Sequence, residues 1–257
     1  MSSFIKNVGI MSISPLITQI LTFFIMPVVT RIYSPDDFGL FAIYCALLGP
    51  ISILSTMGYS TAIVIPKKDA EASTLFSLCI FFTFAVSVLS ALLILVISSP
   101  LLNWINQTKL DKIIWLIPIS IISHGLYMSL RFWNIRKERF KYITGANISR
   151  FLTNNTSLLI FGFTGFVSGV YIILADFIAS IASPAVLSKN IWKENKELII
   201  KNCSIQKMKE VAKRYSKYPK YIMSYEFLDQ FLIQIPIYIL SFYFSQASIG
   251  FYALGMR

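Results

Sequence analysis

Charged residues are scarce in this sequence. They make up 14% of its 257 residues, and hydrophobic residues make up 56%. An average soluble chain has about 25% charged residues. Acidic residues are the rarer sign, with 12 Asp and Glu against 23 Lys and Arg. This composition excludes an ordinary soluble domain and indicates an integral membrane protein.

Cysteine and histidine are also rare. The three cysteines, Cys45, Cys79 and Cys203, are scattered without a CxxC pair, and the one histidine is His124. Such a set indicates neither a disulfide framework nor a zinc site. GxSxG, HExxH, DxD and glycine-rich phosphate-loop motifs are absent as well. We therefore expect no catalytic residues, no metal and no cofactor, and we predict that the protein is not an enzyme.

The sequence does contain long apolar runs. About 20 apolar helical residues cross the hydrocarbon core of a bilayer. Seven runs fit this length, at residues 9–29, 38–65, 75–97, 113–133, 143–163, 166–187 and 221–244. They predict an all-α polytopic membrane protein with seven transmembrane helices.

Basic residues concentrate on one side of these predicted spans. With the N-terminus in the cytoplasm, the cytoplasmic segments hold 17 Lys and Arg and the external segments hold 3. Lys and Arg accumulate in cytoplasmic loops of membrane proteins, so the count predicts a cytoplasmic N-terminus. It also explains the pI of about 9.6 without a nucleic-acid partner.

The longest connection, residues 189–220, carries ten of these basic residues. Within it Ile205, Met208, Val211 and Tyr215 recur at helical spacing. The pattern fits either an amphipathic helix lying on an anionic leaflet or a solvated cytoplasmic connector.

Two parts of the sequence are similar to each other. Pro27 is followed by FGLFAI at 38–43, and Pro236 is followed by IGFYAL at 249–254. Repeated bundles are common in transporters, so the match indicates that the seventh span opens a second copy of a six-span unit. We expect a six-helix lobe at 1–188, a basic cytoplasmic linker at 189–220, and the first helix of a second lobe with the start of the next at 221–257.

Polar residues inside the predicted spans fall on single helix faces. A charged group in the bilayer costs about 2.5–3.5 kcal/mol or more, so such groups usually face the protein interior or a watery cavity. The stripes are Ser120, His124, Tyr127 and Arg131 in the fourth span, Asn147, Arg150, Asn154 and Ser157 in the fifth, and Glu226, Gln230 and Gln234 in the seventh, with a weaker one at Ser52, Ser55 or Thr56, and Tyr59 in the second. They predict a bundle around a polar central cavity.

The basic members of these stripes have alternative interpretations. Arg131 lies near the end of its span, where it can extend to the interface or face the cavity. Arg150 lies roughly 10 Å inside its span, which favours a role in the cavity. His124 fits either a packing residue or a ligand-binding one.

Acidic residues within the spans are candidates for ion coupling. Asp176 lies near the middle of the sixth span, where it fits either proton or cation coupling or a structural hydrogen bond. Glu226 and Asp229 are three residues apart on one predicted helix, so they can share a face and a cation.

The segment PVVTRIYSPDDFGLF at 27–41, followed by GYSTAIVIP at 58–66, resembles the start of Wzx- or PST-type polysaccharide biosynthesis proteins. These belong to the multidrug/oligosaccharidyl-lipid/polysaccharide exporter superfamily. Residues around Trp133 to Phe140 and from Arg214 to Arg257 are similar to later parts of the same family. The resemblance extends over essentially the whole chain.

This resemblance implies a flippase that moves an undecaprenyl-diphosphate-linked oligosaccharide, for O-antigen or capsule, across the bacterial inner membrane. Membrane lipids and other polysaccharide-assembly membrane proteins are the further partners expected. Such flippases have about a dozen spans in two six-helix lobes around a cationic cavity. We therefore expect this chain to be incomplete, as a fragment or a truncated remnant.

Arg31 and Arg150 are the candidates for binding the diphosphate, because guanidinium pairs with phosphate oxygens in a bidentate fashion. Arg31 could equally be an interfacial anchor paired with Asp36 or Asp37. The remaining cavity candidates are Asn147, Asn154, His124 and Tyr127. Rival functions are a small-molecule exporter of the same superfamily and a membrane-embedded enzyme such as a polymerase or acyltransferase.

Overall fold

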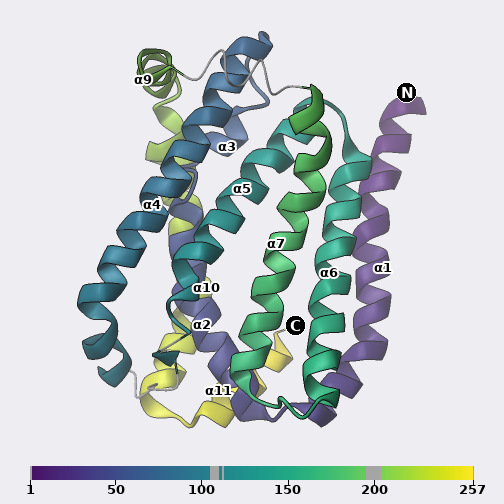
Figure 1. Ribbon diagram of the computed structural model, residues 1–257, viewed down its shortest axis with the longest axis vertical. Coiled ribbons are helices and arrows are strands. Elements are labelled where there is room, and N and C mark those ends of the chain that lie inside the picture. Colours follow the sequence, from purple (N-terminus) through teal and green to yellow (C-terminus); the bar gives the residue numbers. More distant parts are fainter. Residues whose placement is uncertain (1, 105–109, 112, 195–203, 257) are drawn as a thin grey trace.

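The computed structural model describes residues 2–104, 110–111, 113–194 and 204–256, and within them the chain is all-helical, without strands (Figure 1). The elements are α1 (Ser2–Ile32), α2 (Pro35–Leu54), α3 (Tyr59–Ala62), α4 (Asp69–Trp104), α5 (Leu116–Arg136), α6 (Phe140–Phe163), α7 (Gly169–Glu194), α9 (Ile205–Arg214), the π-helix η2 (Tyr218–Met223), α10 (Ser224–Tyr243) and α11 (Gln246–Gly255). The predicted fold class, an all-α membrane protein, is confirmed.

Helices of 20 residues or more occupy the positions of all seven predicted spans: α1, α2, α4, α5, α6, α7 and α10. Four of them, α1, α2, α4 and α7, are both long and apolar enough to cross a membrane. The other three, α5, α6 and α10, carry the polar stripes of the fourth, fifth and seventh predicted spans. That α5, α6 and α10 also span the membrane stays a prediction.

The second predicted span, 38–65, was too long. Helix α2 ends at Leu54, and the chain turns through Met57 and Gly58, whose φ angles are 50° and 72°, before the short helix α3. These left-handed angles interrupt a helix and favour glycine. A Cβ on Gly58 would also lie 3.2 Å from the carbonyl oxygen of Tyr218, so η2 packs closely on this turn.

The long helices form a bundle in which α1 packs on α6, α6 on α7, and α4 on α5 (Figure 1). Helix α2 contacts α5, α7, α10 and α11, so it runs through the middle of the assembly. One apolar cluster surrounds Trp133 near α3, α4 and α9. A second surrounds Ile117 and Ile121 between α2, α4, α5 and α7. These clusters position the polar faces of the same helices.

Helix α2 begins with a capping box. Ser34 Oγ accepts a hydrogen bond from the Asp37 backbone N–H, and Asp37 Oδ2 accepts one from the Ser34 backbone N–H. The other carboxylate oxygen, Oδ1, accepts from the backbone N–H of Gly169 at 2.7 Å. The start of α2 is thereby fastened to the start of α7.

The two similar sequence segments are in direct contact. Ser34 caps α2 and Ser245 caps α11, and each serine is followed five residues later by a glycine, Gly39 or Gly250. A Cβ on Gly39 would overlap the carbonyl oxygen of Gln246, and a Cβ on Gly250 would overlap that of Pro35. The contact is reciprocal, as in a two-fold interface, and both glycines are needed for the close crossing of α2 and α11.

Part of the basic linker is the helix α9, and residues 195–203 of the linker lie outside the described residues. The apolar residues Met208, Val211, Ala212 and Tyr215 pack into the cluster around Trp133. A helix therefore exists within the linker, and most of its apolar side packs against the bundle, whereas Ile205 of the predicted stripe is exposed. That it lies on an anionic leaflet stays a prediction.

Candidate functional site

Polar residues from five helices, α2, α5, α6, α7 and α10, face one cavity of about 270 Å³. Its lining consists of Ser52, Ser120, Ser123, His124, Tyr127, Arg150, Asp176, Ser180, Gln230 and Gln234, with Phe41, Cys45, Leu48 and Gly49. Ten of these fourteen residues carry a hydroxyl, amide, imidazole or charged group. The polar stripes predicted on the second, fourth, fifth and seventh spans contribute to this space.

The charged centre of the cavity is an ion pair between α6 and α7. Arg150 Nη2 donates to Asp176 Oδ1 at 3.3 Å, and the two side chains are 43% and 20% exposed. Among the described residues this is the only hydrogen bond of the Arg150 guanidinium, which carries five N–H donors. Most of its donor capacity is therefore available to a ligand.

Fixed hydrogen bonds hold the surrounding polar side chains. Tyr127 Oη donates to Asn147 Oδ1 at 3.0 Å, which joins α5 to α6. Tyr44 Oη and Ser120 Oγ lie 3.1 Å apart and join α2 to α5. Side chains held in this way present a constant pattern of hydrogen-bonding groups.

A second polar compartment adjoins the first. It measures about 370 Å³ and shares Gly49, Ser52, His124 and Gln230 with the central cavity. It is also lined by Ile53, Thr56, Ser60, Thr61, Met128, Arg131, Phe132 and Glu226. Its own charged groups are an arginine from α5 and a glutamate from α10.

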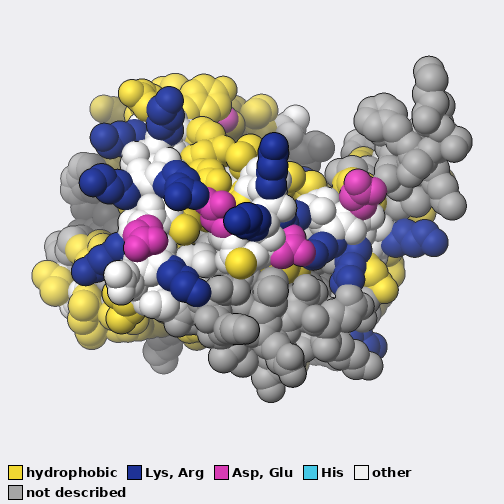
Figure 2. Space-filling view, turned by 90° about the horizontal axis from the view of Figure 1, so that it is seen from above, with side chains coloured by type: hydrophobic (Ala, Val, Ile, Leu, Met, Phe, Trp, Pro, Cys, Tyr) yellow, Lys and Arg dark blue, Asp and Glu magenta, His cyan; other side chains and the backbone are white. Residues whose placement is uncertain are grey.

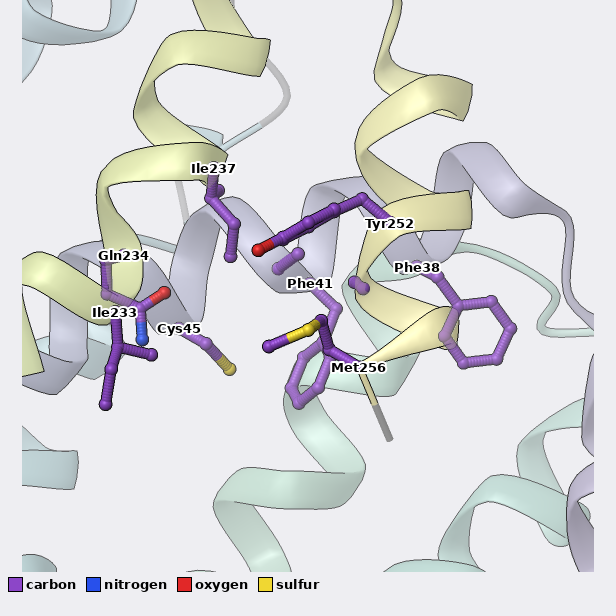
Figure 3. Close-up of a pocket in the computed structure, with 10 residues that line it drawn as sticks. Phe38, Phe41, Cys45, Ile233, Gln234, Ile237, Tyr252 and Met256 are labelled. Carbon is purple, nitrogen blue, oxygen red and sulfur yellow. The ribbon is translucent and has the colours of Figure 1, made fainter.

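A third, mostly apolar cavity of about 280 Å³ lies between α2, α10 and α11 (Figure 3). Phe38, Ile237, Tyr252 and Met256 line it, and it shares Phe41, Cys45 and Gln234 with the central cavity. The three cavities follow one another along α2. The apolar one lies beside the crossing of α2 with α11, and the compartment of Arg131 lies at the other end of α2.

The structure brings together Arg150, His124, Tyr127 and Asn147 of the predicted site, the last through its bond to Tyr127. Arg31 is exposed in the last turn of α1, outside the lining of all three cavities. Its predicted role stays untested.

The three candidates for ion coupling lie in different parts of the bundle. Asp176 lines the central cavity, and Glu226 lines the second compartment, whereas Asp229 is exposed on α10. Asn154 is half-buried, and its Oδ1 is buried without a hydrogen-bond partner. That Glu226 and Asp229 share one cation stays a prediction.

Sequence reasoning missed Ser123 and Ser180, both of which line the cavity. Ser123 Oγ donates to the Ser180 carbonyl oxygen at 2.6 Å and joins α5 to α7. One signal was present for Ser180, because it follows Asp176 by four residues and so shares its helix face.

Basic side chains gather on the end of the bundle seen in Figure 2, where Lys and Arg outnumber Asp and Glu. Arg214 at the end of α9 pairs with Glu71 of α4 at 2.7 Å, and Tyr215 Oη donates to the same carboxylate at 3.3 Å. Burial, together with the nearby Glu71 charge, raises the pKa of the Tyr215 hydroxyl. These contacts attach α9 to α4 and place its basic residues on this face.

A bundle of long apolar helices around a cavity of hydroxyl, amide and guanidinium groups defines a polytopic membrane protein with a hydrophilic internal site. The chain belongs to the polysaccharide biosynthesis protein family, whose pattern it matches over residues 28–257. No curated protein and no solved structure matches it. Its role is therefore in the biosynthesis or export of polysaccharide.

Proposed function

We propose that the protein is a flippase that moves an undecaprenyl-diphosphate-linked oligosaccharide across the bacterial inner membrane and is not an enzyme. The observation that carries the proposal is the central cavity, where Arg150 faces hydroxyl and amide groups with one ion pair only. A diphosphate needs a cation of this kind, and a sugar needs hydrogen-bonding partners. The lipid tail can stay in the bilayer.

The cavity residues divide the head group between them. Arg150 binds the diphosphate, because a planar guanidinium can donate two parallel hydrogen bonds to phosphate oxygens. Tyr127 and His124 bind sugar hydroxyls, since each can donate or accept hydrogen bonds. Asn147 holds the Tyr127 hydroxyl in place from outside the lining. The aliphatic and aromatic residues beside them pack on the apolar faces of the sugar rings.

Asp176 connects binding to ion coupling. In the absence of substrate its carboxylate neutralises Arg150 across the gap between α6 and α7. When the diphosphate engages Arg150, Asp176 loses its partner and becomes a site for a proton or cation. Glu226 in the neighbouring compartment is the second coupling candidate.

We further propose that the basic end of the bundle lies in the cytoplasm together with the N-terminus. The support is the ratio of 17 to 3 Lys and Arg residues on the two sides of the spans. Alkaline phosphatase fused at Asp111 should be active, and the same fusion at Ser204 should be inactive. Activity at Ser204 would contradict the orientation.

The function is tested in cells deleted for their own flippase and supplied with a full-length version of this protein. Arg150→Ala should abolish surface polysaccharide and cause lipid-linked oligosaccharide to accumulate at the cytoplasmic leaflet. Arg150→Lys should retain partial export, because it keeps the charge but loses the bidentate geometry. Arg214→Gln, which removes a charge outside the cavity, is the matched control. Normal export by Arg150→Ala at normal protein levels would remove Arg150 from the site.

A further inference from the structure

Two arginines occupy two different compartments along α2. Arg150 lies in the central cavity and is paired with Asp176. Arg131 lies in the neighbouring compartment, which is connected to the first through the shared residues Ser52 and His124. A ligand bound at Arg131 can therefore pass from this compartment into the central cavity, where Arg150 lies.

Among the described residues, the surroundings of Arg131 leave one nitrogen of its guanidinium, Nε, without a partner. Its Nε is buried, and the described residues offer it no hydrogen-bond acceptor. A buried polar group without a partner costs about 1–3 kcal/mol, and such groups in native structures call for an explanation.

The walls around Arg131 suit an oxyanion ligand. Thr56, Ser60 and Thr61 line it with hydroxyl groups. Thr61 Oγ1 donates to the Gly58 carbonyl oxygen at 2.8 Å, and Thr56 Oγ1 and Ser60 Oγ lie 3.1 Å apart, so one hydroxyl of that pair can still donate to a ligand. Hydroxyl and guanidinium donors together match the oxygens of a phosphate ester. Glu226 lines the same compartment from α10, and the ion pairs among the described residues do not include one between it and Arg131. The carboxylate lowers the net charge of the empty compartment without occupying the donors of Arg131.

We propose that the compartment of Arg131 is a second phosphate-binding subsite, which takes the diphosphate of the lipid-linked substrate before it reaches Arg150. This inference rests on the proposed function. Arg131 lies five residues before the end of α5, near the basic end of the bundle, whereas Arg150 lies in the interior of α6. A diphosphate arriving from that end meets Arg131 first, and its sugars then extend into the central cavity.

The subsite is tested by binding to the purified protein in nanodiscs of phosphatidylcholine, with a synthetic polyprenyl diphosphate as the probe. Arg131→Gln should weaken binding about tenfold, as expected for the loss of a charge-assisted contact. Arg131→Lys should recover part of the loss. Glu226→Gln should tighten binding, because it removes a carboxylate that repels the phosphate. Arg214→Gln removes an exposed charge from the same end of the bundle and should leave binding unchanged.

Each result has a distinct consequence. If Arg131→Gln, with an unchanged melting temperature, binds as the unmodified protein does while Arg150→Gln does not bind, the subsite is wrong and the proposed function stands. If both variants bind normally, the cavity is not the substrate site and both proposals fail. If Arg131→Gln weakens binding of the polyprenyl diphosphate and Arg131→Lys does not recover it, the role of Arg131 is structural.

A further arm distinguishes the transported lipid from ordinary phospholipid. Nanodiscs that contain phosphatidylglycerol should bind the probe as well as those without it. If phosphatidylglycerol competes with the probe in the unmodified protein but not in Arg131→Gln, the compartment holds a bulk phospholipid head group. That result would overturn its assignment to the transported substrate.

Discussion

Arg136 and Arg150 are the same residue type in two regions of the bundle with very different surroundings. The Arg136 side chain is 10% exposed and donates to Asp69 at 2.9 and 3.0 Å and to the carbonyl oxygens of Ile63 and Pro66. The Arg150 side chain is 43% exposed and makes one bond of 3.3 Å, to Asp176. A saturated guanidinium fixes the chain that it contacts, whereas an unsaturated one in a cavity can bind a ligand. The hydrogen-bond partners of each arginine, and not its residue type, therefore indicate whether it has a structural or a ligand-binding role.

The largest effect on stability is expected for Arg136→Gln. This change leaves Asp69 and the carbonyl oxygens of the connection between α3 and α4 without their donor. We expect the free energy of unfolding to fall by about 2–3 kcal/mol, with substrate binding by the folded fraction preserved. Thermal unfolding in detergent measures this, with Lys141→Gln on the exposed side of α6 as the control. An unchanged melting temperature would contradict the structural role.

Arg150→Gln should show the opposite pattern. A single half-exposed ion pair contributes at most about 1 kcal/mol, so the melting temperature should change little. Binding of polyprenyl diphosphate should weaken about tenfold or more, because the cavity loses its cation. A large loss of stability with normal binding would place Arg150 in the same structural class as Arg136.

A smaller change in ligand binding is expected for Asp176→Asn, which alters the single partner of Arg150 and leaves the arginine in place. Without the carboxylate, Arg150 is no longer neutralised in the empty cavity. The diphosphate should therefore bind about threefold more tightly, while transport in cells falls because the coupling group is lost. Weaker binding by Asp176→Asn would show that Asp176 orients Arg150 toward the ligand instead of competing with it.

The smallest effect is expected for Lys137→Gln. Lys137 Nζ contacts Asp69 Oδ2 at 2.6 Å, but its side chain is 26% exposed and Asp69 keeps the two bonds from Arg136. The loss in the free energy of unfolding should be about 0.5 kcal/mol. A loss as large as that of Arg136→Gln would mean that the lysine, not the arginine, holds Asp69.

Periodicity predicted much of the fold and the polar faces of the helices. Residues that follow one another at helical spacing, such as Ser120, His124 and Tyr127, reach the same cavity because spacing within one helix determines the face. The break after α2 was missed because its apolar run continues through Met57 and Gly58. Apolar composition does not distinguish a straight helix from a turn with positive φ.

Contacts between helices could not be predicted in the same way. The pairing of Arg150 with Asp176 depends on how α6 packs against α7, which the spacing within either helix does not specify. The sequence placed Arg136 among the cytoplasmic basic residues and in the segment that resembles the family, but it did not predict its partners, because these come from a connection about 70 residues earlier in the chain. The similarity between the segments of Gly39 and Gly250 was visible in the sequence, but their reciprocal contact was not.

The central claim, that the polar cavity holds the substrate head group, is tested most directly by labelling Cys45. This residue lines the central cavity, and Cys79 is buried and serves as an internal control. Cys203 lies outside the described residues and is replaced by Ser. A charged, water-soluble thiol reagent should label Cys45, and lipid-linked oligosaccharide should slow the reaction in the unmodified cavity but not in Arg150→Gln. Equal labelling of Cys45 with and without the ligand would contradict the account.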